Sequence, residues 1–346
     1  LGRREPGEVT AYFMPGADGP CRFGQYAQFT QRLVERLGIE DAAVLSPKAD
    51  NGYAGLSPRL TLAVWRGIVA GDLFDQARGA LLAAARDPED ALSLLDRCFQ
   101  DVSSAMRRSW RAGLAALRAS ASRLSGVALH TPVGELPALA LVGEIYVRHD
   151  PISRQGLVRR LAAKGFVVRT APVSEWVFYT DWLQNQGITR PGGFKGRVKQ
   201  WFKRRAHAQA LEAFAPSGLA AAHAPDTAEI VRAGSPHVSP MLTGEAILTI
   251  GAAFHEVLAP ACGVVALGPF GCMPTRLAEA VLSRVFDTDN LAALYPGRAR
   301  VLPPEARGRL PLLTVETDGN PFPQLVEAKI EAFCLQAARL HRAMRG

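Results

Sequence analysis

The stretch that most constrains this fold is VVALGPFGCMP, residues Val264–Pro274. Its first four residues predict a short buried strand, and the glycines and proline after them predict a tight turn that carries Cys272. A helix is expected next, because Pro274 suits a first helical turn. A cysteine between a strand and a helix lies beside free backbone N–H groups, which favour the thiolate that binds metals. The alternative is a small buried residue in a turn.

A second cysteine occupies the same kind of position near the start of the sequence. Val9–Met14 alternates and predicts a strand, and the following loop, Gly16–Tyr26, is rich in glycine and proline and contains Cys21. A helix and a strand at Ala42–Leu45 come next, so the pattern predicts a β-α-β unit. Open α/β sheets bind ligands at the carboxyl ends of their strands. Cys21 and Cys272 are therefore both candidate site residues.

The rest of the chain predicts a helical segment followed by a second β-α-β unit. Helical periodicity covers residues 60–124, with breaks expected at Gly71 and at the Asp87–Pro88 turn. The continuously apolar start of Ala138–Val147 is typical of a parallel strand that is buried on both faces. The later elements are expected at Gln155–Lys164 (helix), Phe166–Arg169 (strand), Leu312–Val315 (strand) and Gln324–Arg342 (helix).

The sequence thus predicts an α/β protein with two Rossmann-like domains, parallel sheets and a helical insertion. Residues 1–130 would form the N-terminal α/β domain with the long helical segment, and residues 131–346 the C-terminal α/β domain. Val9–Met14 and Ala138–Val147 are expected to be central strands of their sheets.

The composition indicates a cytoplasmic protein. The chain has 346 residues and five cysteines, an odd number without disulfide-like spacing, which is typical of a reducing compartment. No apolar run approaches the ~20 residues that span a bilayer, so no membrane partner is expected. No signal peptide is seen at Leu1, and because the first residue is not Met, further upstream sequence is expected.

The net charge of +8 is concentrated in KGRVKQWFKRR, residues Lys195–Arg205. Basic residues that surround aromatic ones can bind single-stranded nucleic acid, but the alternative is a surface helix with a solvated basic face. No nucleic-acid-binding module surrounds the run, so nucleic acid is not expected as a partner. We predict that Lys199, Lys203 and Arg204 are exposed and that Trp201 or Phe202 packs inward.

Four polar residues fall in or near predicted strand ends: Glu144, His149, Asp150 and Glu175. Glu144, in an apolar strand, needs a partner. Each of the other three is either a site residue or a satisfied polar residue in a loop.

The remaining cysteines are expected to be structural, and several common catalytic and nucleotide-binding motifs are missing. Cys98 and Cys334 lie on apolar helix faces and are expected in the core, and Cys262 is expected at a helix end. The sequence contains no GxxxxGK[ST], no GxGxxG after a strand, no CxxC and no GxSxG, so neither a P-loop nor a standard dinucleotide cradle is expected.

These motifs resemble the 2-hydroxyacyl-CoA dehydratase superfamily, and more closely the acyl-CoA dehydratase activase-related proteins with a dehydratase D-subunit-like fold. The resembling stretches are spread in order over most of the chain, and PCRFGQY and PFGCMP are the most specific. They are Met14–Tyr26, Val142–Ser153, Ala171–Trp176, Leu242–Gly251 and Gly268–Pro274.

The resemblance implies two α/β domains with an iron–sulfur cluster, expected to be of the 4Fe–4S type, in the cleft between them. It assigns Cys21 and Cys272 as cluster ligands, in agreement with the thiolate chemistry of such clusters. The neighbouring residues that it places around the cofactor are Gly19, Pro20, Arg22, Pro269, Phe270 and Gly271.

Two departures from the family pattern bear on function. Two thiolates are fewer than the four ligands of a cubane, so further ligands are expected from upstream sequence, a second subunit or a non-cysteine group. The phosphate motifs of the actin-like activase are missing, so ATP hydrolysis is not expected.

The leading hypothesis is an iron–sulfur reductase or dehydratase component that transfers low-potential electrons to a small anionic substrate such as a coenzyme A thioester. It would form a homo- or hetero-oligomer with a related iron–sulfur or activase subunit. The alternative is a non-catalytic scaffold or assembly subunit that pairs with a cluster-bearing partner.

Overall fold

The computed structural model describes residues 5, 7–16, 21–47, 57–220, 226–259, 261–296 and 307–345. A β-α-β unit comes first, made of β1 (Thr10–Phe13), α1 (Phe23–Arg36) and β2 (Ala42–Leu45). The two strands are parallel, with Thr10 opposite Ala42, as predicted. The expected central position of β1 is wrong for the described residues, because its sheet has only these two strands.

Much of this first unit is exposed. Val34 is the one buried residue of α1. Several large apolar side chains of the unit face solvent, among them Tyr12, Phe13, Phe29, Leu33 and Leu37. Parallel sheets are usually covered on both faces, so this unit has apolar surface that the described residues leave open.

Three long helices follow: α2 (Pro58–Ala84), α3 (Pro88–Arg108) and α4 (Trp110–Ser125). Ser57, Asp87 and Ser109 cap them by accepting hydrogen bonds from backbone N–H groups of the first turn. The turn at Asp87–Pro88 is confirmed. The predicted break at Gly71 is wrong, because a glycine costs a helix only about 1 kcal/mol and the buried side chains around it hold α2 continuous.

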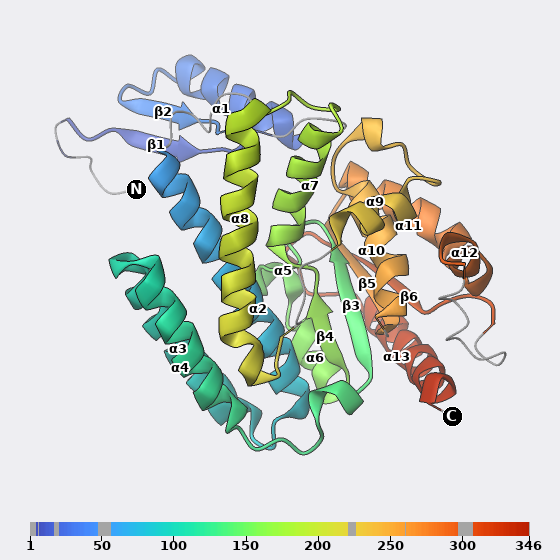
Figure 1. The fold of residues 1–346 in the computed structure, drawn as a ribbon. Coiled ribbons are helices and arrows are strands. Elements are labelled where there is room, and N and C mark those ends of the chain that lie inside the picture. Colours follow the sequence, from blue (N-terminus) through green and yellow to red (C-terminus); the bar gives the residue numbers. More distant parts are fainter. Residues whose placement is uncertain are drawn as a thin grey trace.

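A four-stranded parallel sheet forms the centre of the molecule, in the order β4-β3-β5-β6 (Figure 1). Its strands are β3 (Ala138–Gly143), β4 (Val167–Thr170), β5 (Ala261–Pro269) and β6 (Leu312–Thr317). All six residues of β3 are buried between its two neighbours, which confirms the prediction of a central strand buried on both faces. The fold is therefore α/β with two parallel sheets.

Strand β3 ends four residues before the predicted Val147. Gly143 has a φ of 111°, and a Cβ atom there would lie 2.1 Å from the carbonyl oxygen of Leu267. Only glycine fits this close approach of β3 to β5. Glu144 consequently lies just beyond the strand instead of inside it.

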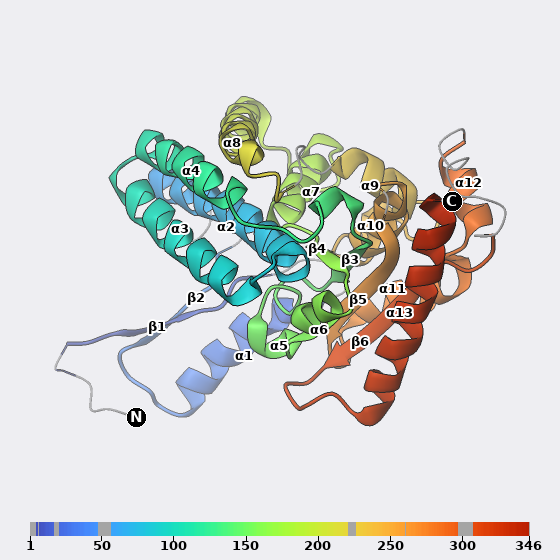
Figure 2. The same ribbon diagram turned by 90° about the horizontal axis from the view of Figure 1, so that it is seen from below.

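Helices surround the central sheet (Figure 2). Lys164, which follows α6, forms an ion pair of 2.6 Å with Glu331 of α13, while α9, α10 and α11 pack together. The helix predicted at 155–164 begins only at Leu157, because Gln155 has a φ of 46° and separates α5 from α6. The remaining helices are α5 (Pro151–Arg154), α6 (Leu157–Ala163), α7 (Val173–Asn185), α8 (Gly193–Phe214), α9 (Thr227–Gly234), α10 (Ala246–Leu258), α11 (Met273–Val285), α12 (Thr288–Leu294) and α13 (Gln324–Arg345), with single 3-10 turns at Val133–Glu135, Ala215–Ser217 and Pro240–Leu242.

Helix α2 packs against the outer strand of the central sheet. A Cβ atom at Gly79 would lie 2.2 Å from the carbonyl oxygen of Val168, so the helix backbone touches β4. This contact covers a strand edge that would otherwise be open. Because the contact crosses residue 130, the helical segment and the central sheet share packing; the division into 1–130 and 131–346 and the two Rossmann-like domains stay predictions.

The buried cysteines behave largely as expected. Cys98 and Cys334 are buried in hydrophobic clusters, which confirms their core assignment. The placement of Cys262 at a helix end is wrong, because it lies in β5 at a shift of register opposite Ala138. Its thiol donates to the carbonyl oxygen of Ala138 at 3.2 Å, which satisfies a group left unpaired by the bulge.

Two predictions about the basic run are wrong. Trp201 and Phe202 are both exposed, and Lys203 is half-buried and paired with Asp181 at 2.5 Å. The predicted exposure of the other two basic residues, Lys199 and Arg204, is confirmed. The buried side of α8 is formed by other residues, among them Ala206, Ala210 and Phe214. In the part of the chain that the structure describes, no helix has the length and apolar character needed to cross a bilayer.

Candidate functional site at the carboxyl edge of the central sheet

The strand order defines where a ligand would bind. After β3 the chain enters β4 on one side, and it later returns to β5 on the other side of β3. The helices that follow these strands diverge at such a switch point, which leaves a crevice at the carboxyl ends of the strands. The turn that carries Cys272 begins at the end of β5, so it lies at this edge.

The Cys272 turn is held firmly in place. Gly271 has a φ of 68°, and its N–H donates to a carboxylate oxygen of Glu316 at 3.2 Å. The N–H of Phe270 donates to the carbonyl oxygen of Thr317 at 2.9 Å, although the Phe270 side chain itself is exposed. Both partners lie in β6. The turn therefore continues the hydrogen bonding of the sheet beyond the end of β5.

The Cys21 turn meets the Cys272 turn through Arg22. The guanidinium Nη2 of Arg22 donates to the carbonyl oxygen of Gly271 at 2.9 Å. Cys21 precedes this donor in sequence and Cys272 follows the acceptor, so the two turns lie side by side although about 250 residues separate them. Of the other predicted cofactor neighbours, Pro269 is the last residue of β5, and Gly19 and Pro20 lie outside the described residues.

Exposure separates these two cysteines from the others. Cys21 and Cys272 are half-buried, whereas Cys98, Cys262 and Cys334 are buried. A ligand can therefore reach the first two without opening the core.

The environment of Cys272 does not favour a free thiolate. Burial raises the pKa of Cys272, and the charges of Glu245 and Glu144 raise it further. Hydrogen bonds from Thr275, in the first turn of α11, act in the opposite direction but are the smaller effect. Burial thus opposes the helix N-terminus, which the sequence leads us to expect to favour the thiolate of Cys272, and that expectation stays a prediction. A bound metal would have to displace the proton.

Two glutamates beside the crevice have pKa values raised to about 7, and sequence reasoning missed one of them as a site residue. Burial is the main cause for both Glu245 and Glu175. The charge of Glu144 raises the pKa of Glu245 further, while Arg148 opposes the shift at both. Glu245 accepts a hydrogen bond from the N–H of Ile145, just beyond the end of β3, at 3.1 Å. Its burial had no local signal, because it precedes α10 in a polar loop.

Two further buried charged residues, Arg148 and Asp72, form hydrogen bonds with backbone groups at the strand ends. Arg148, only 4% exposed, donates to the carbonyl oxygens of Gly143 at 2.7 Å and Pro172 at 3.2 Å, which ties the end of β3 to the loop after β4. Asp72 of α2 accepts hydrogen bonds from the N–H groups of Val173 and Ser174 at 2.8 and 2.9 Å, and so caps α7.

Three of the four polar residues predicted in or near strand ends have hydrogen-bond or ion-pair partners: Glu144, His149 and Asp150. Glu144 accepts hydrogen bonds from the N–H groups of Tyr146 and Val147 at 3.1 and 2.9 Å. His149 lies 3.3 Å from Asp75, and Asp150 caps α5 by accepting from the N–H of Ser153 at 2.7 Å. For His149 and Asp150 these contacts match the interpretation as satisfied loop residues.

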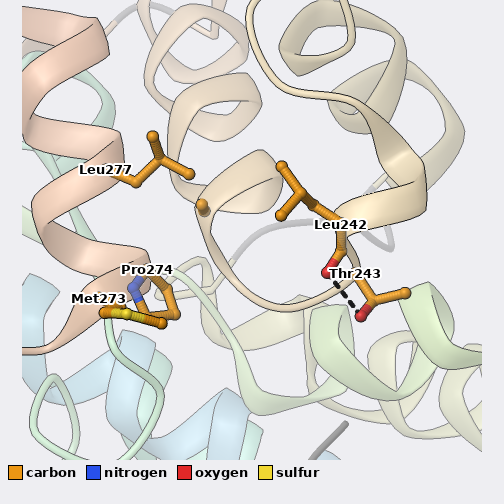
Figure 3. Close-up of a pocket in the computed structure, with 6 residues that line it drawn as sticks. Leu242, Thr243, Met273, Pro274 and Leu277 are labelled. Carbon is orange, nitrogen blue, oxygen red and sulfur yellow. Dashed lines mark hydrogen bonds between the residues drawn. The ribbon is translucent and has the colours of Figure 1, made fainter. Parts of the chain in front are cut away.

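A cavity of about 300 Å³ lies next to the Cys272 turn (Figure 3). The side chains of Leu242 and Leu277 point towards it from opposite sides, while the Thr243 hydroxyl turns back to the carbonyl oxygen of Leu242 at 2.7 Å. The cavity is mainly apolar, and could accept a small apolar group of a ligand. Its lining residues are Leu242, Thr243, Ala246, Met273, Pro274 and Leu277.

The described residues do not supply a complete metal site by themselves. Within the described ranges, no group of three or more His, Cys, Asp or Glu side chains is arranged to hold a metal ion.

No protein-family model matches this chain, and searches among curated proteins and solved structures found no match either.

Proposed function

We propose that this protein binds an iron–sulfur cluster through Cys21 and Cys272, and that it transfers low-potential electrons as a reductase or dehydratase component. The observation that carries the proposal is the Arg22–Gly271 hydrogen bond, which brings the two cysteine-bearing turns together at the sheet edge where α/β proteins bind ligands. The resemblance to the 2-hydroxyacyl-CoA dehydratase superfamily assigns the same two cysteines as ligands.

The two cysteines fit one half of a cluster site. Iron–sulfur clusters take four ligands, and both thiols are accessible enough to bind iron. The other two ligands would come from a second polypeptide or from residues beyond those described. A cluster of the 4Fe–4S type, held between this chain and a related iron–sulfur or activase subunit, fits this requirement.

The residues around the thiols have separate roles in this proposal. Arg22 fixes the distance between the two turns, and Glu316 holds the Cys272 turn against β6. The carboxylates of Glu144 and Glu245 place negative charge near Cys272, which disfavours the addition of an electron at the site. The bound cluster would supply one-electron chemistry at the low potential that these charges favour.

The apolar cavity beside Cys272 suggests the kind of substrate. Its volume of about 300 Å³ suits a small apolar group, so the reactive part of the substrate would be small. The family resemblance favours a coenzyme A thioester, whose anionic part would remain outside this cavity. Free thiols and a labile cluster also favour a reducing location such as the cytoplasm.

A scaffold or assembly function is the second candidate. It is favoured by the exposed apolar side chains of the first β-α-β unit, such as Phe13 and Phe29, which suit a protein interface. A scaffold would need no cluster of its own, so bound iron separates the two functions.

The decisive test is cluster reconstitution under anaerobic conditions, followed by iron and acid-labile sulfide analysis. The wild-type chain should gain visible iron–sulfur absorption, and Cys21→Ala or Cys272→Ala should lose it together with most of the iron. Cys98→Ala and Cys334→Ala are matched controls, because these cysteines are buried away from the turns. Full iron retention in Cys21→Ala would contradict the proposed site.

A further inference from the structure

Helix α8 presents an apolar stripe to solvent along its outer side. Phe194, Val198, Trp201 and Phe202 are 76%, 38%, 54% and 49% exposed. The first three are four and three residues apart, a spacing that aligns side chains along one face of a helix. Gln200, Ala206, His207 and Ala210 of the same helix are buried. The exposed aromatic residues are therefore not among the residues by which α8 packs against the rest of the protein.

Five cations border this stripe: Lys195, Arg197, Lys199, Arg204 and Arg205, all of which are exposed. Among the described residues, none of the five forms an ion pair. Lys203 differs, because Asp181 neutralises it on the buried side. We call the four apolar residues and these five cations the α8 stripe. Its charge selects an anionic partner and disfavours a second copy of the same surface.

The shape of the α8 stripe favours a flat partner over a strand of nucleic acid. Helix α8 stands at the periphery of the molecule (Figure 2). Among the described residues, no residue of α8 lines either of the two best-formed cavities. The Arg205 guanidinium lies over the Trp201 ring, 5.6 Å from its centroid, and Phe202 meets the same ring edge-on at 4.9 Å. Arg205 thus occupies a face of the Trp201 ring on which a base would otherwise stack.

We propose that the α8 stripe docks this protein on the surface of an anionic lipid bilayer. The aromatic side chains would enter the headgroup region, where Trp residues are enriched in membrane proteins, and the flanking cations would contact lipid phosphates. Such peripheral binding needs no spanning helix. The sequence-based expectation of no membrane partner rested on the lack of a spanning segment, so it does not bear on this mode of binding.

The test measures sedimentation of the whole chain with phosphatidylcholine vesicles, with and without phosphatidylglycerol. Binding should require phosphatidylglycerol and weaken as salt is added. Arg197→Gln with Arg204→Gln should lower the partition coefficient by about 25-fold, because each cation near such a surface contributes about fivefold. Trp201→Ala with Phe202→Ala should lower it by about tenfold or more.

Matched controls come from exposed residues on other helices. Arg107→Gln with Arg108→Gln on α3, and Phe99→Ala with Leu335→Ala, remove similar groups from other surfaces and should leave binding unchanged. Brominated lipids should quench the fluorescence of wild-type protein more than that of Trp201→Phe, since Trp201 would be in the bilayer. Circular dichroism should show that all variants remain folded.

Three outcomes would overturn the proposal. They are equal binding to neutral vesicles, unchanged binding of both α8 double variants, and binding to an oligothymidylate but not to vesicles. The last would assign the α8 stripe to single-stranded nucleic acid instead. None of these results depends on cluster content, so this inference and the proposed function are tested separately.

Discussion

The two parallel sheets of this protein differ sharply in how they are covered. In the central sheet, every residue of β3 and all but the last of β5 are buried. In the first unit, three of the four residues of β1 are exposed, as are Phe29, Leu33 and Leu37 around α1. The candidate site joins these regions, because Cys21 belongs to the first unit and Cys272 to the central sheet.

The difference suggests that the two halves of the site are held in place to different degrees. The Cys272 turn is bonded to β6 and fixed by the core, whereas the Cys21 turn is attached to a small unit with little core of its own. Arg22 connects the fixed half to the open half. A partner that covers the first unit would therefore also order one side of the site.

The largest expected contrast comes from two phenylalanines. Phe286 is 1% exposed and packs edge-on against Phe254, so Phe286→Ala should destabilise the protein by about 3–5 kcal/mol. Phe29 is 66% exposed, so Phe29→Ala should change the free energy of unfolding by only about 0.5 kcal/mol. Urea denaturation measures both. An equally large loss for Phe29→Ala would mean that α1 is covered in solution and would remove the contrast.

The next effect is a pH dependence confined to the central region. Folding raises the pKa of Glu175 from 4.5 to about 7, so the folded state binds the proton more tightly and stability falls as pH rises through this range. Glu175→Gln should therefore be more stable than wild type at pH 8, by on the order of 3 kcal/mol, and no more stable near pH 4.

Glu35→Gln on the exposed α1 is the matched control for this titration, and its stability should stay within about 0.5 kcal/mol of wild type at both pH values. A Glu175→Gln variant without a pH-dependent gain would show that water reaches this carboxyl group.

The smallest effect on stability should come from Arg22→Ala. The hydrogen bond it removes is partly exposed, so the loss should be about 1 kcal/mol or less. Cluster retention should fall clearly, however, because the two cysteine turns are then held less rigidly. Arg32→Ala, on the exposed side of α1, should change neither quantity. Equal iron retention in both variants would show that Arg22 does not organise the site.

The local parts of this structure could be predicted from sequence. The strand and turn before Cys272 are marked by a short apolar run and by Gly271, whose backbone preferences are local. The predicted strand end at Leu267 is wrong, because pairing with β6 extends β5 through Gly268 and Pro269. Both β-α-β patterns were identified for the same reason. Gly71 misled the prediction, because the burial that keeps α2 helical depends on packing with distant elements.

The contacts that build the site are not local, which explains what was missed. Arg22 and Gly271 are 249 residues apart, and nothing near Glu245 in the sequence signals its hydrogen bond with Ile145. The same limit applies to Trp201, whose exposure depends on which side of α8 meets the core. Sequence placed the two cysteines at strand ends, but their charged surroundings followed only from the fold.

The central claim, that Cys21 and Cys272 form one site, is tested most directly by cross-linking the cluster-free protein with dibromobimane, which becomes strongly fluorescent after joining two nearby thiols. The account predicts a cross-link that peptide mapping assigns to Cys21 and Cys272, and its loss once the cluster has been reconstituted. A cluster-free protein that forms no such cross-link, or a reconstituted protein that still forms it, would contradict the claim.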